Sequence, residues 1–270
     1  MIVRAVASVL QQPGTPTVTI AVAAAQLVIF FRPMNIDIFG PLSTAPISSV
    51  SLQPRQIVER LQLSRLLTAG VVHVDEYHVC YNMASLLYKG AEIERERGSA
   101  ALVVMLAAAY LISSLVYVAL AVVLFLFTPF TDVYTTTNTV GFSGVLFALK
   151  VILTHNKPAN AMVQGPFGIT MPVRYAAWAE LIYIHLFVPQ SSFLGHLAGI
   201  ITGFIVVYAE KPFRAWYRAS TFTAFSGTSG TTGDQDEEHE RRRRAYYSAA
   251  GTSSAGGGHA GRPTSRPHYD

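Results

Sequence analysis

Six apolar segments, joined by polar connections, constrain this chain more than any other feature. They run from Val18 to Phe31, His78 to Tyr88, Ala100 to Phe127, Gly141 to Thr154, Tyr175 to Phe187 and Phe193 to Tyr208. The chain of 270 residues is 51% hydrophobic and 13% charged, whereas soluble domains carry about 25% charged residues. We therefore predict an all-α membrane protein with six transmembrane helices that lie in the lipid bilayer.

The fourth segment is shorter than an ordinary membrane span. About 20 apolar residues are needed to cross roughly 30 Å of hydrocarbon, and about 14 residues rise only about 21 Å. Such a helix must be sheltered by its neighbours or must begin in a water-filled recess. A recess of this kind is a suitable place for a reactive side chain.

Basic residues are distributed unequally between the connections. They follow the second segment (Lys89, Arg95, Arg97), flank the fourth-to-fifth connection (Lys150, Lys157, Arg174) and follow the sixth (Lys211, Arg214, Arg218). The connections after the third and fifth segments contain no Lys or Arg. The positive-inside rule then places both termini in the cytosol. The long first connection, which has four arginines, is the exception.

The end of the chain differs in composition. From about Ser220 it is rich in Ser, Thr, Gly and charged residues, which cannot bury enough apolar area to fold. We expect a six-helix membrane domain over residues 1–210 and a mostly disordered cytosolic tail over residues 211–270. The single cysteine, Cys80, excludes an intrachain disulfide and a cysteine metal cluster. No cofactor, metal or nucleic-acid partner is predicted.

Four polar side chains in the second, fourth and sixth segments fall at a similar depth. These three helices run in the same direction, and His78, Ser143 and His196 each lie within about the first turn. Asn82 is one turn deeper than His78, on the same face. Polar groups inside a membrane are costly and usually have a function. We interpret these four residues as one site near the lumenal surface.

A serine that meets a histidine predicts nucleophilic catalysis. The hydroxyl is a weak nucleophile until a base takes its proton, and neutral His196 can take it and later protonate the leaving amine. The Ser143 backbone N–H, the His78 imidazole and the Asn82 amide can donate to the oxyanion. No acid is placed to orient His196, so the pattern favours a dyad. Phe147, one turn after Ser143, can stack on the imidazole instead.

Glycines allow the fourth and sixth helices to approach closely. Gly141 and Gly144 flank Ser143, and Gly199 and Gly203 form a small-residue face one turn below His196. Small residues let membrane helices pack backbone to backbone. We therefore expect Ser143 and His196 to come within hydrogen-bond reach.

These motifs together resemble the signature of the rhomboid intramembrane serine proteases. The resemblance covers about Leu61 to Tyr208 in order, spacing and helix assignment, and its residues are His73, His78, Asn82, Gly141, Ser143, Gly144, His196, Gly199 and Gly203. It implies a six-helix rhomboid bundle, a catalytic dyad of Ser143 and His196, and an oxyanion site that includes His78 and Asn82. The motif glycine matches Gly141. For His73 we favour a structural residue that orders the first connection over a supporting role in the site. The segment Glu94 to Gly98, after the second helix, is similar to another family motif.

Two stretches resemble one subfamily more closely. Residues 81–90 and 140–150 are similar to the endoplasmic-reticulum rhomboid-related proteins that have a cytosolic C-terminal tail. That resemblance implies cleavage of unstable transmembrane proteins in quality control, in the membrane of the endoplasmic reticulum. In some members an Arg-rich tail motif recruits the AAA ATPase valosin-containing protein. The run Arg241–Arg244 partly resembles that motif. We favour a solvated charge run over such a partner site, and attraction to anionic lipid is another alternative.

Other interpretations remain open from the sequence. Ser143 can be a small helix-packing residue, and His196 and Asn82 can simply tie helices together. The chain can be a non-proteolytic client-binding adaptor, as rhomboid pseudoproteases and derlins are. A small transporter is a third class, and the absence of an inverted repeat argues against it. For Glu180 and His185 in the fifth segment, a structural polar network is favoured over catalysis.

Overall fold

The computed structural model describes residues 6–7, 9, 11–31, 46–155, 157–158, 160–165, 168–225, 237–238, 240–242 and 244, and describes side chains in the last long helix only as far as Glu210. The chain divides into two units, Met1–Ala224 and Phe225–Asp270. Most of the predicted disordered tail lies outside the described residues. In its described part, exposed i,i+4 ion pairs join Glu237 to Arg241 and Glu238 to Arg242.

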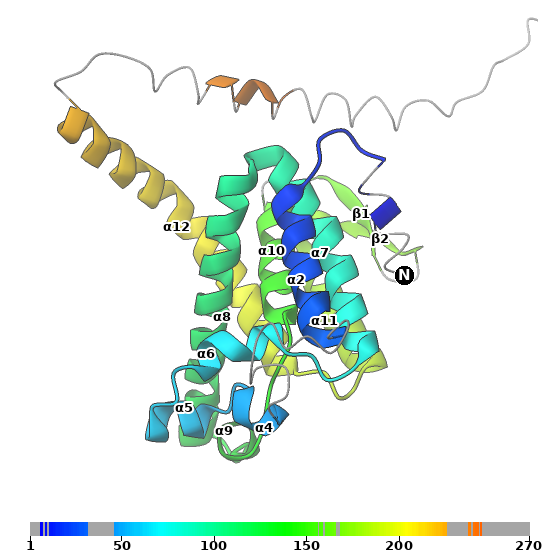
Figure 1. Cartoon of the computed structure of the whole chain (residues 1–270), viewed down its shortest axis with the longest axis vertical. Coiled ribbons are helices and arrows are strands. Elements are labelled where there is room, and N and C mark those ends of the chain that lie inside the picture. The colour runs from blue at the N-terminus through cyan, green and yellow to red at the C-terminus, as the bar shows by residue number, and fades with distance from the viewer. Residues whose placement is uncertain are drawn as a thin grey trace, which may run out of the picture. The chain divides into compact units, whose positions relative to one another are not determined.

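Long helices build the first unit (Figure 1). Within the described residues they are α2 (Thr17–Phe31), α7 (Glu76–Arg97), α8 (Ser99–Phe127), α10 (Ser143–His155), α11 (Ala176–Phe187) and α12 (Phe193–Phe225). Each falls on one of the six predicted segments. Helix α7 is longer than predicted at both ends, and α12 continues past Tyr208 and through the predicted boundary at residue 210.

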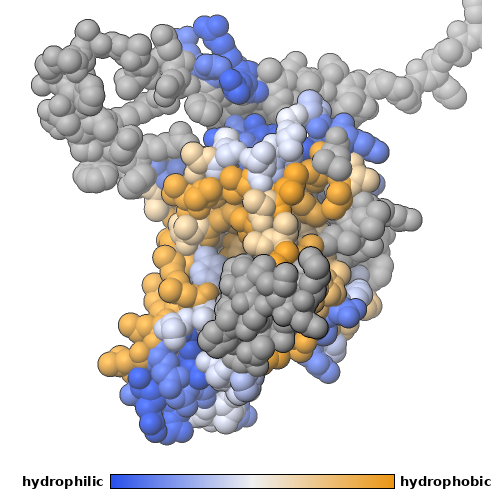
Figure 2. Space-filling model, in the orientation of Figure 1, coloured by the Kyte–Doolittle hydropathy of each residue, from blue (hydrophilic) through white to orange (hydrophobic). Residues whose placement is uncertain are grey.

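The membrane character of these helices differs. Among the described helices, α8 and the part of α12 from Phe193 to Glu210 are long and apolar enough to cross a bilayer, while α2 and α10 are apolar but shorter. On the face shown in Figure 2, apolar residues gather in a band across the middle of the bundle, with more hydrophilic surface toward its ends. A band of this kind suits a protein whose middle lies in hydrocarbon.

Short elements gather at the two ends of the bundle (Figure 1). At one end lie α4 (Ile47–Val50), α5 (Pro54–Arg60), α6 (Arg65–Thr68), the 3-10 turn η2 (Ala69–Val71) and α9 (Asp132–Thr135). Toward the other end, β1 (Met162–Gln164) and β2 (Thr170–Pro172) form an antiparallel hairpin, followed by η4 (Val173–Tyr175). The hairpin corrects the all-α prediction, because three-residue strands give too little periodicity to be recognised in sequence.

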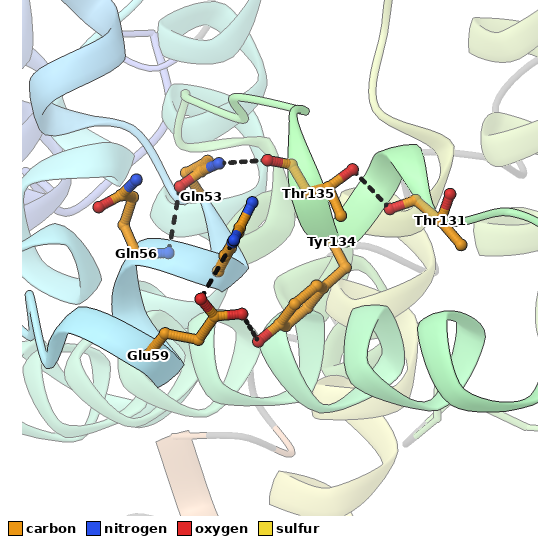
Figure 3. Close-up of polar contacts among 7 residues, drawn as sticks. Gln53, Gln56, Glu59, Thr131, Tyr134 and Thr135 are labelled. Atoms are coloured by element: carbon orange, nitrogen blue, oxygen red, sulfur yellow. Dashed lines mark hydrogen bonds and ion pairs between the residues drawn. The ribbon is translucent and has the colours of Figure 1, made fainter.

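The first connection is tied to the segment that leads into α10. The Gln53 side chain caps α5 by accepting from the Gln56 N–H at 3.1 Å, and it donates to the Thr135 carbonyl at 2.7 Å (Figure 3). The Tyr134 hydroxyl donates to Glu59 at 3.3 Å. These bonds hold α5 against α9 and so fix the position of the segment that follows α9.

Glu94 joins three helices near the other end of the bundle. Its carboxylate accepts from the backbone N–H groups of Val18 and Thr19, each at 2.9 Å, and from the Ser99 hydroxyl at 2.7 Å. An acidic group at a helix N-terminus satisfies orphan N–H groups and complements the helix dipole. The motif from Glu94 to Gly98 is therefore the last turn of α7 and its cap, not a connection after the helix. Gly98, with φ +86°, is the whole link to α8.

Candidate active site

The turn before α10 sets the position of Ser143. Thr139 and Leu52 exchange backbone hydrogen bonds of 3.0 and 2.8 Å, and the Gly141 N–H donates to the Ala69 carbonyl at 2.9 Å. Gly141 has φ +111°, a conformation that side-chain-bearing residues rarely adopt. Helix α10 then begins at Ser143. Because the first N–H groups of a helix have no intrahelical acceptor, those around Ser143 can bind another oxygen.

Ser143 and His196 meet across α10 and α12. The His196 Nε2 atom lies 3.0 Å from the Ser143 Oγ atom, which is hydrogen-bond distance. His196 is buried, whereas Ser143 is half-buried. The prediction that the two side chains come within hydrogen-bond reach is confirmed. The arrangement gives a hydroxyl that a ligand can reach and a base shielded from water.

Phe147 lies against the histidine as predicted. The two rings are stacked, with centroids 4.6 Å apart and planes inclined by 29°. Phe147 is 1% exposed, so its own position is fixed by packing. The His196 Nδ1 atom is buried and has no hydrogen-bond partner among the described residues. Ring stacking, rather than a carboxylate, therefore orients the imidazole.

His78 and Asn82 come from α7 and border the same turn. A Cβ atom at Gly141 would lie 2.7 Å from His78 Nε2 and 3.6 Å from Asn82 Nδ2. The Asp75 side chain caps α7 by accepting from the His78 N–H at 2.7 Å, which sets the register of this face. His78 and Asn82 therefore lie together beside the turn that leads into Ser143. A side chain at position 141 would collide with the His78 ring.

Buried polar atoms without partners cluster around this site. Among the described residues they include Asn82 Nδ2 and His196 Nδ1. The His73 ring packs edge-to-face on His78, with centroids 5.0 Å apart. Buried polar groups are nearly always paired, and an unpaired group needs an explanation. A donor left free for a reacting oxygen is one such explanation.

Close packing of α10 on α12 depends on two of the predicted glycines. A Cβ atom at Gly199 would lie 2.2 Å from the Gly144 carbonyl oxygen, and one at Gly203 would lie 2.5 Å from Val151 Cβ. Gly144 differs, because its nearest obstacle would be the Gly195 oxygen at 3.4 Å, an ordinary contact. Gly144 thus contributes its carbonyl to the contact, and its lack of a side chain is not required.

A buried charge cluster beside Phe147 was not predicted as a unit. The Glu180 carboxylate lies 2.7 Å from Lys89 Nζ and 3.3 Å from Lys150 Nζ. Lys89 Nζ is also 5.8 Å from the centre of the Phe147 ring. Lys89 was predicted to follow the second helix, but it lies inside α7, and Lys150 lies inside α10 within the predicted fourth segment. The expected polar network around Glu180 is present, while His185 packs its ring on Phe193.

Comparisons with known proteins place this geometry in a family. Residues 60–212 match the model of the Rhomboid domain. The chain belongs to the rhomboid family. It is 41% identical over 201 residues to Rhomboid-like protein 14, mitochondrial, from Arabidopsis thaliana, covering 74% of this chain and 58% of that protein. It is 34% identical over 220 residues to Rhomboid-related protein 4 from Homo sapiens, covering 82% of this chain and 65% of that protein.

A more distant rhomboid relative carries an activity in its name. Rhomboid-type serine protease 2 from Eremothecium gossypii is 24% identical over 176 residues, covering 65% of this chain and 62% of that protein. The chain spans less than two thirds of the length of each of these three relatives. Rhomboid proteins are integral to membranes and are generally serine proteases, which is the family-level activity.

Proposed function

We propose that this protein is an intramembrane serine endopeptidase that cleaves transmembrane segments of other proteins with a Ser143–His196 dyad. The observation that carries the proposal is the 3.0 Å contact between Ser143 Oγ and the buried His196 Nε2 in a bundle of apolar helices. A membrane-integral family whose members include serine proteases supports it.

The proposed reaction has two halves. Ser143 Oγ attacks the carbonyl carbon of the scissile bond while its proton passes to His196 Nε2, and the imidazolium then protonates the departing amine. Water next attacks the acyl-enzyme with His196 again as base, which releases the carboxylate product and restores Ser143. In each half the Asn82 amide, the His78 ring and the Ser143 N–H donate to the oxyanion.

The proposed setting is a bilayer crossed by the six long helices, with both termini in the cytosol and Ser143 near the lumenal side. Substrates enter sideways from the lipid, and helices that unwind easily are preferred, because an intact helix hides its carbonyls. We place the protein in the endoplasmic reticulum and in membrane-protein quality control. Protease protection of tagged termini in isolated organelles tests the topology and the organelle together. The partner prediction for Arg241–Arg244 stays a prediction.

Cleavage of a single-span model substrate by the purified full chain in liposomes tests the proposal. We expect wild-type protein to cut the substrate, and Ser143→Ala and His196→Ala each to abolish cutting. Ser49→Ala, at an exposed serine in α4, and His259→Ala are matched controls that should cut normally. Equal cutting by Ser143→Ala and wild type would refute the dyad. Client binding without any cutting by wild type would favour the adaptor alternative.

A further inference from the structure

A cavity of about 220 Å³ lies at the end of α10 opposite to Ser143. Its wall combines two kinds of side chain. His155, Lys157 and Arg174 supply basic groups, and Trp178 and Phe204 supply aromatic surface. Trp178 is 40% exposed, so this surface continues outside the cavity. Neither the family assignment nor the proposed reaction assigns a function to this cavity.

The basic groups of the cavity are not equally available. Lys157 Nζ lies 2.9 Å from the Glu92 carboxylate, which offsets most of its charge. The Arg174 guanidinium lies over the Tyr175 ring, 4.9 Å from its centre, and has no carboxylate partner among the described residues. Arg174 is also exposed. The cavity therefore presents an uncompensated guanidinium beside an aromatic wall.

This pairing of groups fits one chemical class of ligand. A guanidinium binds phosphate through two parallel hydrogen bonds, and exposed tryptophan favours the boundary between hydrocarbon and headgroups. Lys157 and Arg174 belong to the connection that the charge distribution places on the cytosolic side. That leaflet carries anionic lipids, and basic pockets between membrane helices bind their headgroups.

We propose that this cavity binds the phosphate of an anionic phospholipid through Arg174, with an acyl chain along Trp178 and Phe204. A free phosphate would not need the aromatic side chains, so the proposed ligand is the lipid. Glu92 competes with the ligand for Lys157. Removing the Glu92 charge should therefore strengthen lipid binding. A substitution that merely damages the protein would weaken it.

Quenching of Trp178 fluorescence by brominated lipid tests the proposal without reference to proteolysis. The chain has two tryptophans, so the full chain with Trp216→Phe reports on Trp178 alone. It is placed in phosphatidylcholine nanodiscs that contain increasing brominated phosphatidic acid. We expect saturable quenching, and weaker quenching by the same fraction of brominated phosphatidylcholine. Arg174→Gln should raise the half-saturating fraction roughly tenfold, and Arg174→Lys should raise it less.

The remaining variants separate a site from general charge attraction. Glu92→Gln should lower the half-saturating fraction. Arg55→Gln, at an exposed residue of α5 at the other end of the bundle, should leave it unchanged. Equal quenching by the two lipids would overturn the proposal, as would no effect of Arg174→Gln. Displacement of the quencher by millimolar inorganic phosphate would overturn it in favour of a soluble anion. Far-ultraviolet circular dichroism confirms that each variant is folded.

Discussion

Asn82 is 1% exposed, and its amide nitrogen has no hydrogen-bond partner among the described residues. An unsatisfied buried donor costs about 1–3 kcal/mol of stability. The same donor borders Gly141, next to the place where Ser143 would create an oxyanion. The Asn82 amide therefore reduces stability while it faces the reacting atoms, as expected where activity is kept at the expense of stability.

Replacing Asn82 should therefore separate stability from activity. We expect Asn82→Leu, which retains similar volume, to keep or raise the thermal midpoint of unfolding while substrate cleavage falls about 10²–10³-fold. Gln26→Leu in α2 is the matched control, because the Gln26 carbonyl oxygen is also buried without a partner. Gln26→Leu should keep full cleavage. A fall in stability with Asn82→Leu, and no loss of cleavage, would remove Asn82 from the oxyanion site.

His73 should make stability depend on pH. Burial and the neighbouring His78 lower the pKa of His73 from 6.5 to about 3. Between these values the unfolded chain binds a proton that the folded chain does not, so stability is complete above about pH 6.5 and falls as the pH approaches 3. Thermal unfolding, followed by far-ultraviolet circular dichroism, should show this slope, and His73→Phe should make it less steep. An unchanged slope would contradict the assignment.

Helices α10 and α12 are the elements whose contact assembles the dyad. Each carries one of the two reacting side chains, and they meet where the Gly144 carbonyl fits against Gly199. An ordinary helix pair is held 8–10 Å apart by its side chains. Gly144 follows Ser143 directly, and Gly199 lies three residues after His196. The contact between these two glycines therefore sets the dyad distance, which makes helix packing part of the chemistry.

Gly199→Ala should disrupt the site by moving a whole helix. Its Cβ would lie 2.2 Å from a backbone oxygen, so α12 must shift away from α10. We expect a loss of about 1–3 kcal/mol in unfolding free energy and loss of substrate cleavage. Gly144→Ala, whose Cβ would meet its nearest atom at 3.4 Å, should keep a thermal midpoint close to wild type. Equal midpoints for the two variants would contradict the close-contact account.

Glu180 ties α11 to α7 and α10 through Lys89 and Lys150. All three side chains are mostly buried, with 16%, 5% and 25% exposed respectively. Glu180→Gln would leave two cations without their counter-charge, and breaking a buried pair costs about 3–5 kcal/mol. A lower thermal midpoint should follow, with partial recovery in Glu180→Leu combined with Lys89→Met, because Lys150 keeps its charge. Arg55→Gln, which breaks only the exposed pair with Glu59, should cost under about 1 kcal/mol. A similar small cost for Glu180→Gln would show that the cluster is not structural.

For the whole molecule, the sequence predicted the features that repeat along a helix. Apolar runs located all six long helices, and the shared depth of His78, Ser143 and His196 predicted a site that the structure assembles. Phe147 was found because one turn of helix separates it from Ser143. These inferences worked because helical periodicity converts spacing in sequence into position in space.

The features that were missed depend on contacts between distant segments. The burial of Lys89 and Lys150 was not predicted, because a buried lysine is recognisable only when its partner, Glu180, is placed beside it. Gln53 lies in a long connection that has no periodic pattern, so its bond to Thr135 could not be predicted. The hairpin could not be predicted either, because its strands are too short to show a periodic pattern. The role of Gly144 could be separated from that of Gly199 only in the three-dimensional structure.

The central claim for the whole protein is that His196 activates Ser143 inside the assembled bundle. Labelling of the purified full chain by a fluorophosphonate, with the modified residue located by mass spectrometry, tests this most directly. We expect one adduct on Ser143 in wild type, none in Ser143→Ala, and loss of labelling in His196→Ala while the thermal midpoint is retained. Labelling of Ser143 that is equally fast in His196→Ala would contradict the dyad, as would a folded wild-type protein that remains unlabelled.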